Sequence, residues 1–301
     1  MASLYTHRAR NIRKTWFIFT GFLIVVIGLG WSFSYVYGDT SIFYIAIFFS
    51  LFMNVLAYWH SDKIVLKMAH AHPVTRENAR ELYNIVENLC ITAGLPVPKM
   101  YIVDEQAPNA FATGRDPEHA AVAVTQGLLD RLDRSELEGV LAHELSHIGN
   151  RDMLVSTVVV VLVGFIALLS DFFLRSIFWR GRGRSSRSEG NAGAVFMLIG
   201  IVLAILSPII AKLMHLAISR KREFLADSSG ALLTRYPEGL ARALKKIASD
   251  ETPLRVAHNT TAHLWLDDPF KGKQKKSWFH RLFLTHPPTE KRIAALLGTE
   301  I

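Results

Sequence analysis

Long apolar stretches alternate with polar blocks along the chain. Four of the stretches approach or exceed the length of about 20 helical residues that crosses the hydrocarbon core of a bilayer. Half of the 301 residues are hydrophobic, and they are strongly clustered. The pattern predicts four membrane-spanning helices, at Trp16–Tyr37, Ser41–Trp59, Met153–Phe173 and Ala194–Leu216.

The first two predicted spans form a tight hairpin, because only residues 38–40 separate them. Four basic residues come before the first span: Arg8, Arg10, Arg13 and Lys14. Basic residues beside a span favour the cytoplasmic side, so we expect the N-terminus and the polar block after the second span in the cytoplasm. The first run is too long for the apolar core of a signal peptide, about 7–15 residues, and predicts a retained anchor.

The second hairpin fits this topology less simply. Its connection, residues 175–193, carries five arginines against a single acidic residue, Glu189. Full crossing of both spans would leave these arginines outside, contrary to the positive-inside rule. We expect the spans to cross nevertheless, because the first helix usually determines the orientation.

The polar blocks predict an α+β fold that is mainly helical. Ser135 is followed by Glu138 three residues later, a capping-box pattern that predicts the start of a helix. Apolar periodicity predicts further helices, and short β-branched runs predict strands. The helices are expected over residues 74–96, 219–233, 237–250 and 289–298, and the strands over 98–105 and 120–127.

The chain therefore divides into four parts. Residues 1–60 form the N-terminal transmembrane hairpin, and residues 61–152 form the first polar block. Residues 153–216 form the second transmembrane hairpin, and residues 217–301 form the second polar block.

Charge and cysteine content narrow the expected partners. The net charge of +8 suits either nucleic acid or an anionic membrane surface, and the apolar spans favour the lipid bilayer, so no nucleic-acid partner is expected. Cys90 is the single cysteine, which excludes an internal disulfide and a cysteine-ligated metal site. The basic and aromatic segment 271–283 either contacts anionic headgroups or packs its aromatic residues on the domain.

The segment from His143 to His147, directly before the third span, has the spacing HExxH. Residues four apart share one face of a helix, so both imidazoles can bind one zinc ion. Glu144 lies beside them as a general base that does not bind the metal. The alternative is an unrelated pair of helix histidines, but the pattern arises by chance in such a composition in roughly 2% of cases.

A catalytic zinc usually has three protein ligands and one open position. If the fourth span returns the chain to the same membrane surface, the residues about two turns beyond it lie near the histidines. Glu223 and Asp227 are four apart at that place. We predict Glu223 as the third ligand, with Asp227 accepting a hydrogen bond from a ligand imidazole. Asp152 and His215 are the nearest competitors of Glu223.

Three segments together resemble the HtpX-like membrane zinc metalloproteases, relatives of the type I CAAX prenyl proteases. They are HELSHIGNRD (143–152), SRKREFLAD (219–227) and THPPTEKRI (285–293). The resemblance covers nearly the whole chain. It implies a four-span integral membrane protein of the bacterial inner membrane with a cytoplasmic gluzincin-type metalloprotease domain. One Zn²⁺ per chain would serve proteolysis of misfolded or damaged membrane proteins, and no oligomeric state is implied.

The resemblance also implies roles for individual residues. His143, His147 and Glu223 match the family's zinc ligands, and Glu144 matches its catalytic base. His286 and Arg292 match the polar pair thought to hold the developing oxyanion. In the segment APNAFATG, the residues that would pair with an extended substrate are Asn109, Ala110, Phe111 and Ala112. From its residues alone, this segment is only a turn that leads to a strand.

Three other functions compete with this interpretation. A narrow-specificity processing protease of the prenyl-protease type would have more spans, which form a large chamber. A membrane adaptor without proteolytic activity would close its structural zinc with four protein ligands, but only three candidates are evident. A metal transporter would place its ligands inside the spans, and here they lie outside them.

Overall fold

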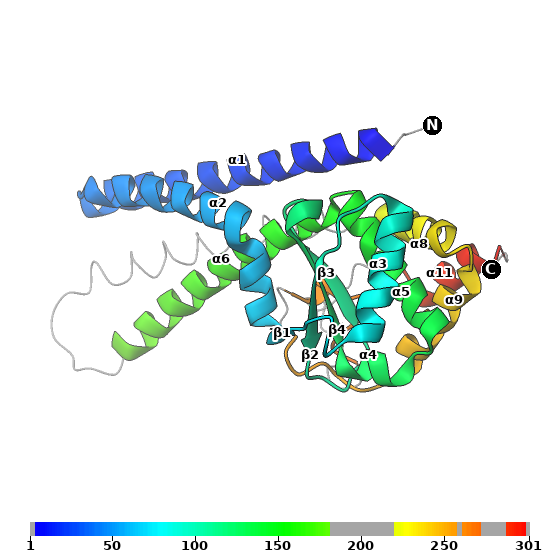
Figure 1. Cartoon of the computed structure of the whole chain (residues 1–301). Helices are drawn as coiled ribbons and strands as arrows, with labels where there is room; N and C mark the ends of the chain where they lie inside the picture. The colour runs from blue at the N-terminus through cyan, green and yellow to red at the C-terminus, as the bar shows by residue number, and fades with distance from the viewer. Residues whose placement is uncertain (1–3, 181–219, 258–260, 272–286, 299–301) are drawn as a thin grey trace.

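The computed structural model of the protein describes residues 4–180, 220–257, 261–271 and 287–298. Long helices extend beyond one side of a rounded part that contains a small β-sheet (Figure 1). These helices are α1 (Leu4–Tyr37), α2 (Ser41–Met68) and α6 (Asp152–Arg180). The fold is α+β and mainly helical, as the sequence predicts.

Two helices are long and apolar enough to cross a membrane. Their apolar stretches are Ala9–Tyr35 and Ser41–Met68, with mean hydropathies of 2.0 and 1.9, and they match the first two predicted spans. The third predicted span lies within α6, and the described part of α6 counts as a further span only together with the preceding helix, across a bend of 82°. The fourth predicted span lies outside the described residues.

The long helices pack against one another through an apolar cluster. It joins Ile18 and Phe22 of α1 with Met53 and Ala57 of α2 and with the first turns of α6. The outward faces of α1 and α2 expose large apolar side chains, including Trp31 (62%) and Phe48 (72%). Such continuous apolar exposure marks a surface made for lipid or for another protein, which supports the assignment of α1 and α2 as spans.

The sheet has four strands in the order β1-β2-β4-β3. Strands β2 and β4 are parallel, and the other two pairs are antiparallel. The strands are β1 (Ala71–Pro73), β2 (Lys99–Val103), β3 (Ala110–Gly114) and β4 (Ala120–Thr125). The residue pattern predicts β2 and β4, whereas β1 is a three-residue strand that contains a proline and β3 is rich in alanine and glycine.

Both faces of the sheet are covered, which is why every residue of β4 is buried. Val122 and Val124 face a core that also contains residues of α3 (Arg80–Ala93), α5 (Arg134–Gly149) and α9 (Pro237–Ser249). Ala121 and Ala123 face Val65 of α2 and Val160 of α6. The sheet thus lies between α3, α5 and α9 on one face and α2 and α6 on the other.

Helix α5 begins earlier than the sequence suggests. Asp133, and not Ser135, is its N-cap: the Asp133 carboxylate accepts a hydrogen bond from the Glu136 backbone N–H at 2.9 Å. The Glu136 carboxylate in turn accepts from the Asp133 N–H at 2.9 Å. This capping box replaces the predicted one, because Asp133 precedes Ser135 and already satisfies the first free N–H groups of the helix.

The second polar block packs directly on α5. Its helices α8 (Arg220–Thr234), α9 and α11 (Thr289–Leu297) match the predicted ones within the described residues. Gly230 of α8 lies so close to α5 that an added Cβ would be 3.0 Å from the His143 backbone nitrogen. This close approach brings the two polar blocks together at the histidines. The remaining short helices are α4 (Gln126–Arg131), η1 (Pro117–His119) and η2 (Ala262–Leu264).

Candidate metal centre

A sharp turn links the HExxH helix to the third predicted span. Helix α5 ends at Gly149, and Arg151 takes a left-handed conformation with φ of 55°. Helix α6 then starts at Asp152, and the two helix axes differ by 82°. The turn returns the chain over the last turn of α5, so that the first residue of α6 lies beside His147.

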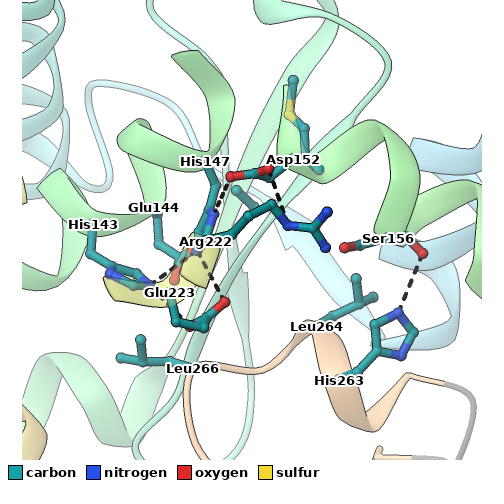
Figure 2. Close-up of a pocket in the computed structure, with 12 residues that line it drawn as sticks. His143, Glu144, His147, Asp152, Ser156, Arg222, Glu223, His263, Leu264 and Leu266 are labelled. Atoms are coloured by element: carbon teal, nitrogen blue, oxygen red, sulfur yellow. Dashed lines mark hydrogen bonds and ion pairs between the residues drawn. The ribbon is translucent and has the colours of Figure 1, made fainter. Parts of the chain in front are cut away.

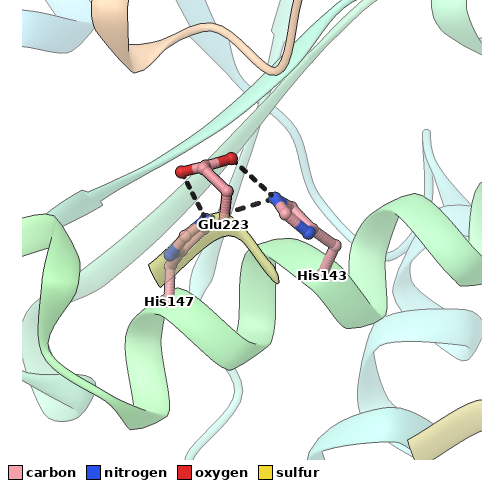
Figure 3. A group of neighbouring side chains, drawn as sticks. All are labelled: His143, His147 and Glu223. Carbon is pink, nitrogen blue, oxygen red and sulfur yellow. Dashed lines mark hydrogen bonds and ion pairs between the residues drawn. The ribbon is translucent and has the colours of Figure 1, made fainter. Parts of the chain in front are cut away.

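Three side chains from two helices converge at this place (Figure 3). His143 and His147 come from α5, and Glu223 comes from the first turn of α8. The two Nε2 atoms lie 3.2 Å apart. The Glu223 carboxylate oxygens lie 3.8 Å from His143 Nε2 and 3.7 Å from His147 Nε2. The structure therefore brings together the three residues predicted as metal ligands.

The spacing and chemistry of these atoms fit one zinc ion. Zinc binds imidazole nitrogen and carboxylate oxygen at about 2.0–2.2 Å, so the ligand atoms of one tetrahedral ion lie about 3.3–3.6 Å apart. The observed separations of 3.2, 3.7 and 3.8 Å are close to these values. Three protein ligands leave one position open, which is typical of a catalytic zinc.

Each histidine is oriented by a carboxylate on its other ring nitrogen. His143 Nδ1 lies 2.9 Å from Asp227 of α8, and His147 Nδ1 lies 3.2 Å from Asp152 of α6. A proton held at Nδ1 by a carboxylate leaves the lone pair of Nε2 for a metal. Asp152, a predicted competitor for the ligand position, thus contacts the side of His147 that faces away from Glu223.

Each carboxylate is held in turn by a buried arginine. Arg292 donates to Asp227 from Nε at 2.9 Å and from Nη2 at 2.7 Å. Arg222 Nε lies 3.2 Å from Asp152. Arg292 is 2% exposed and Arg222 5% exposed. Each candidate ligand histidine is therefore held by an aspartate, and each aspartate is held by a buried arginine.

The charges around the site shift the pKa values of its ionisable groups. Burial lowers the pKa of His147, but the hydrogen bond with Asp152 and the charge of Glu223 outweigh burial and raise this pKa to about 9. Burial raises the pKa of Asp227, but the hydrogen bonds from Arg292 and His143 prevail and lower it to about 2. Without metal, His147 thus carries a proton at neutral pH, which a metal would displace on binding.

Glu144 lies in the pocket beside the histidines (Figure 2). It is 3% exposed, and burial raises its pKa against the opposing charges of His143 and His147. Its carboxylate has no hydrogen-bond or ion-pair partner within the part of the chain that the structure describes. A buried carboxylate with a raised pKa and no fixed partner suits a general base, because the raised pKa makes it a stronger proton acceptor.

The pocket around Glu144 has a charged wall and an apolar wall. Its described lining comes from β3, α5, α6, α8 and the segment around η2, and consists of Ala112, His143, Glu144, His147, Asp152, Met153, Ser156, Arg222, Glu223, His263, Leu264 and Leu266. Figure 2 shows Leu264 and Leu266 opposite the polar groups. The pocket thus offers apolar contacts next to the candidate metal centre.

The predicted substrate segment forms the edge strand β3. Asn109 is 2% exposed, and its side chain bonds the backbone of Asp267, with Nδ2 3.1 Å from the carbonyl oxygen. The Ala110 carbonyl accepts a hydrogen bond from Leu266 N–H at 3.0 Å. Phe111 is fully buried against Trp265. Of the four residues, Ala112 is the one that lines the pocket.

Of the predicted oxyanion pair, Arg292 belongs to the residues that the structure describes. Arg292 directs its nitrogens to Asp227, to the Leu266 carbonyl at 3.3 Å and toward Glu223 at 4.0 Å. These contacts tie Arg292 to the residues around the metal centre, and its role toward the oxyanion stays a prediction. His286 and the alternative ligand His215 lie outside the described residues.

Sequence reasoning missed the partners of Asp152. The five-residue spacing from His147 to Asp152 could have predicted their contact, because a turn directly after α5 brings the two side chains together. Arg222 is the immediate neighbour of Glu223, but its contact with Asp152 depends on how α8 packs on the α5–α6 turn, which local spacing does not reveal.

Known proteins are similar to this chain in sequence and in fold. The profile of Peptidase family M48 matches residues 76–300. The Protease HtpX homolog of Caldanaerobacter subterraneus is 46% identical over 302 residues, which cover 99% of both chains. That of Pyrococcus furiosus is 48% identical over 280 residues, 92% of this chain and 93% of its own. The crystal structure of S. mikatae Ste24p shares the fold, with a TM-score of 0.50 and 21% identity over 94% of this chain and 66% of Ste24p.

Proposed function

The chain belongs to peptidase family M48 and is a membrane metalloprotease, and we propose that it uses zinc to cleave misfolded or damaged membrane proteins at the cytoplasmic membrane surface. One observation carries this proposal. His143, His147 and Glu223 converge beside Glu144 in a pocket that lies where α6 begins. Proteolytic chemistry and membrane attachment are thus combined at one place.

Glu144 is the proposed general base. Its carboxylate would take a proton from the attacking water and deliver it to the leaving amine. Bound zinc would supply Lewis acidity that polarises the scissile carbonyl. His143, His147 and Glu223 would hold that ion, and Asp227 and Asp152 would keep the two imidazoles in the tautomer that binds it.

We assign Arg292 to the support of the metal centre, since its guanidinium is used by Asp227 and by the Leu266 carbonyl. By holding Asp227, it fixes the ring of His143. The oxyanion role implied by the resemblance is then proposed for His286, whose imidazole could donate to the charge that develops on the carbonyl oxygen.

The substrate would bind as an added strand on β3. Alternate residues of an antiparallel edge strand direct their backbone groups away from the sheet. The Ala110 carbonyl points outward in this way and accepts a hydrogen bond from Leu266. Ala112 follows two residues later and lines the pocket, so its backbone is positioned to bond an extended peptide. The apolar wall of Leu264 and Leu266 would favour apolar residues, such as those that a misfolded membrane protein exposes.

The proposed location is the inner membrane of a bacterium, with several spans and with the active site on the cytoplasmic side. The basic residues before α1 support this orientation through the positive-inside rule. The polypeptide substrate and the bilayer are the proposed partners, and the basic segment 271–283 is a proposed contact for anionic headgroups.

A narrow-specificity processing protease is the second candidate function. The contact of Leu266 with Ala110 shortens the free edge of β3 on one side, which would suit a substrate with a defined end. Broad quality control would instead use only the part of the edge around Ala112.

The two functions differ in their response to substrate folding. The full chain, purified in detergent with zinc, is incubated separately with two substrates. One is a stable membrane protein, and the other is a destabilised variant of that protein with the same loop sequences. Quality control predicts cleavage of the destabilised variant at several sites and at least about tenfold faster, because cleavage follows local unfolding. Equal rates at a single bond in both proteins would favour the processing enzyme and would contradict the quality-control role.

A further inference from the structure

A polar side chain of the first membrane helix reaches the metal centre. Asn11 of α1 is 1% exposed. Its Nδ2 donates to Asp152 Oδ1 at 2.7 Å and to the Asn150 carbonyl at 3.1 Å. Both amide hydrogens are therefore used at the turn between α5 and α6, the turn that sets the position of His147.

Asn11 also closes a ring of polar contacts. Arg222 Nη1 lies 3.5 Å from Asn11 Oδ1, and Arg222 Nε lies 3.2 Å from the same Asp152 oxygen that Asn11 contacts. The second Asp152 oxygen lies 3.2 Å from His147 Nδ1. Three helices distant in sequence, α1, α6 and α8, thus meet around a single carboxylate, and that carboxylate orients a metal ligand.

We propose that Asn11 is a positioning residue of the metal centre, which holds Asp152 and through it His147, so that zinc affinity depends on this one contact from the first membrane helix and not on the packing of α1 in general. The proposal rests on the zinc site proposed above. It adds α1, which the sequence predicts only as an anchor, to the elements that build that site.

The chemistry of the ring explains why an amide suits this position. Asp152 already faces a buried guanidinium and an imidazole, so a further cation is not needed for charge balance. A neutral amide supplies a donor to Asp152 and an acceptor to Arg222 without adding charge. A carboxylate here would face Asp152 with like charge in a buried place, which is unfavourable.

The proposal predicts a moderate effect on the metal. Loss of a direct partner of a ligand histidine typically costs about 10- to 100-fold in metal affinity or activity. Asn11 acts one step further out, so we expect Asn11→Ala to weaken zinc binding about three- to tenfold.

The test compares three variants of the full chain in detergent by competition for zinc with a chelator. Asn11→Ala removes the side chain, and Asn11→Asp keeps its size but loses the donor to Asp152. Asn54→Ala is the matched control, because Asn54 Nδ2 donates to the Phe19 carbonyl at 3.2 Å and so joins α2 to α1 away from the metal centre. The thermal stability of each metal-free protein is measured in parallel.

The expected result is weaker zinc binding by both Asn11 variants, with the Asn54→Ala protein equal to the wild type. Zinc affinity that is unchanged in Asn11→Asp would overturn the proposal, since it would reduce Asn11 to a space-filling role. An equal loss in Asn54→Ala would also overturn it, because general loosening of α1 would then explain the effect. Zinc binding is read without any protease substrate, so failure of the proposed proteolysis would leave this test intact.

Discussion

Asp227 occupies the most consequential position among the residues around the ligands. It lies between His143 and Arg292, is 2% exposed, and receives hydrogen bonds from both. Its depressed pKa means that it stays ionised at all but very acidic pH. The charge of Asp227 therefore compensates a buried guanidinium and orients an imidazole at the same time.

Replacement Asp227→Asn tests this double role. The change removes the carboxylate that the buried Arg292 guanidinium bonds directly, and breaking a buried ion pair in this way typically costs about 3–5 kcal/mol of folding free energy. We expect that loss in chemical unfolding of the metal-free protein, together with weaker zinc binding. Glu87→Gln is the control, because the pair of Glu87 with Arg76 is exposed and should contribute less than about 1 kcal/mol. Equal stability losses in the two variants would contradict this account.

The raised pKa of His147 predicts how zinc binding depends on pH. Below about 9 the metal-free imidazole holds a proton, and zinc must displace it. Apparent zinc affinity should therefore rise as pH increases from 6 toward 9, by about tenfold per pH unit for each proton displaced. Asp152→Asn removes the carboxylate whose hydrogen bond raises the pKa of His147 most. The apparent zinc affinity of this variant should therefore stop rising at a lower pH. Titrations at several pH values measure this, and parallel profiles for both proteins would refute it.

Residue patterns reveal most directly those parts of a site that are close in sequence, whereas Glu223 and Asp227 also required the expected return of the chain to the same membrane surface. HExxH places two imidazoles and a base on one helix turn, so local spacing was enough to bring out His143, Glu144 and His147. The position of Arg292 depends on how α11 packs near α8, and no spacing encodes that contact. For this reason its pairing with Asp227 emerges from the structure alone.

At the scale of elements, the turn between α5 and α6 and the packing of α8 on α5 determine the site. Regular apolar periods predict the helices, and short β-branched runs predict the two central strands. Helix α5 has its N-cap two residues before the predicted one, because two capping patterns overlap there and Asp133 comes first in the chain. The residue pattern does not predict strand β3, because tertiary contacts, rather than its own strand propensity, hold it extended.

Gly230 provides a test of the helix packing. An added Cβ would lie 3.0 Å from His143 N and 3.2 Å from the Ala142 carbonyl carbon, both backbone atoms of α5. Gly230→Ala should push α8 outward, move Glu223, and reduce stability by about 1–3 kcal/mol along with zinc affinity. Gly149→Ala is the control, because its Cβ would meet only Leu95 side-chain atoms at 3.7 Å and beyond. Unaltered zinc binding in Gly230→Ala would contradict the role of this contact.

At the scale of the whole molecule, the long apolar helices and the candidate metal centre form one unit. Helix α6 runs from the metal centre into the cluster with α1 and α2, and the sheet packs against residues of α2 and α6. This arrangement explains why an HExxH helix stands directly before an apolar stretch in the sequence. It also supports the proposal that a substrate reaches the pocket at the bilayer surface.

The proposed topology is testable with cysteine labelling. Cys90 is buried, and burial raises its pKa to about 11, so the native thiol should react slowly. Cysteines introduced at the exposed Thr40 and Glu77 mark the hairpin tip and the polar block. In intact cells or spheroplasts, an impermeant maleimide should label Thr40→Cys and spare Glu77→Cys until the membrane is opened. The reverse pattern would place the active site outside.

The central claim is that a zinc ion at His143, His147 and Glu223 works with Glu144 as general base. The most direct measurement determines bound zinc and cleavage of a destabilised membrane protein for the wild type and for Glu144→Gln, each stripped by chelator and titrated with zinc. The account predicts one zinc per chain in both proteins, and cleavage that follows zinc content in the wild type but falls at least about a hundredfold in the variant. Cleavage by Glu144→Gln at the wild-type rate, or by the wild type without zinc, would contradict it.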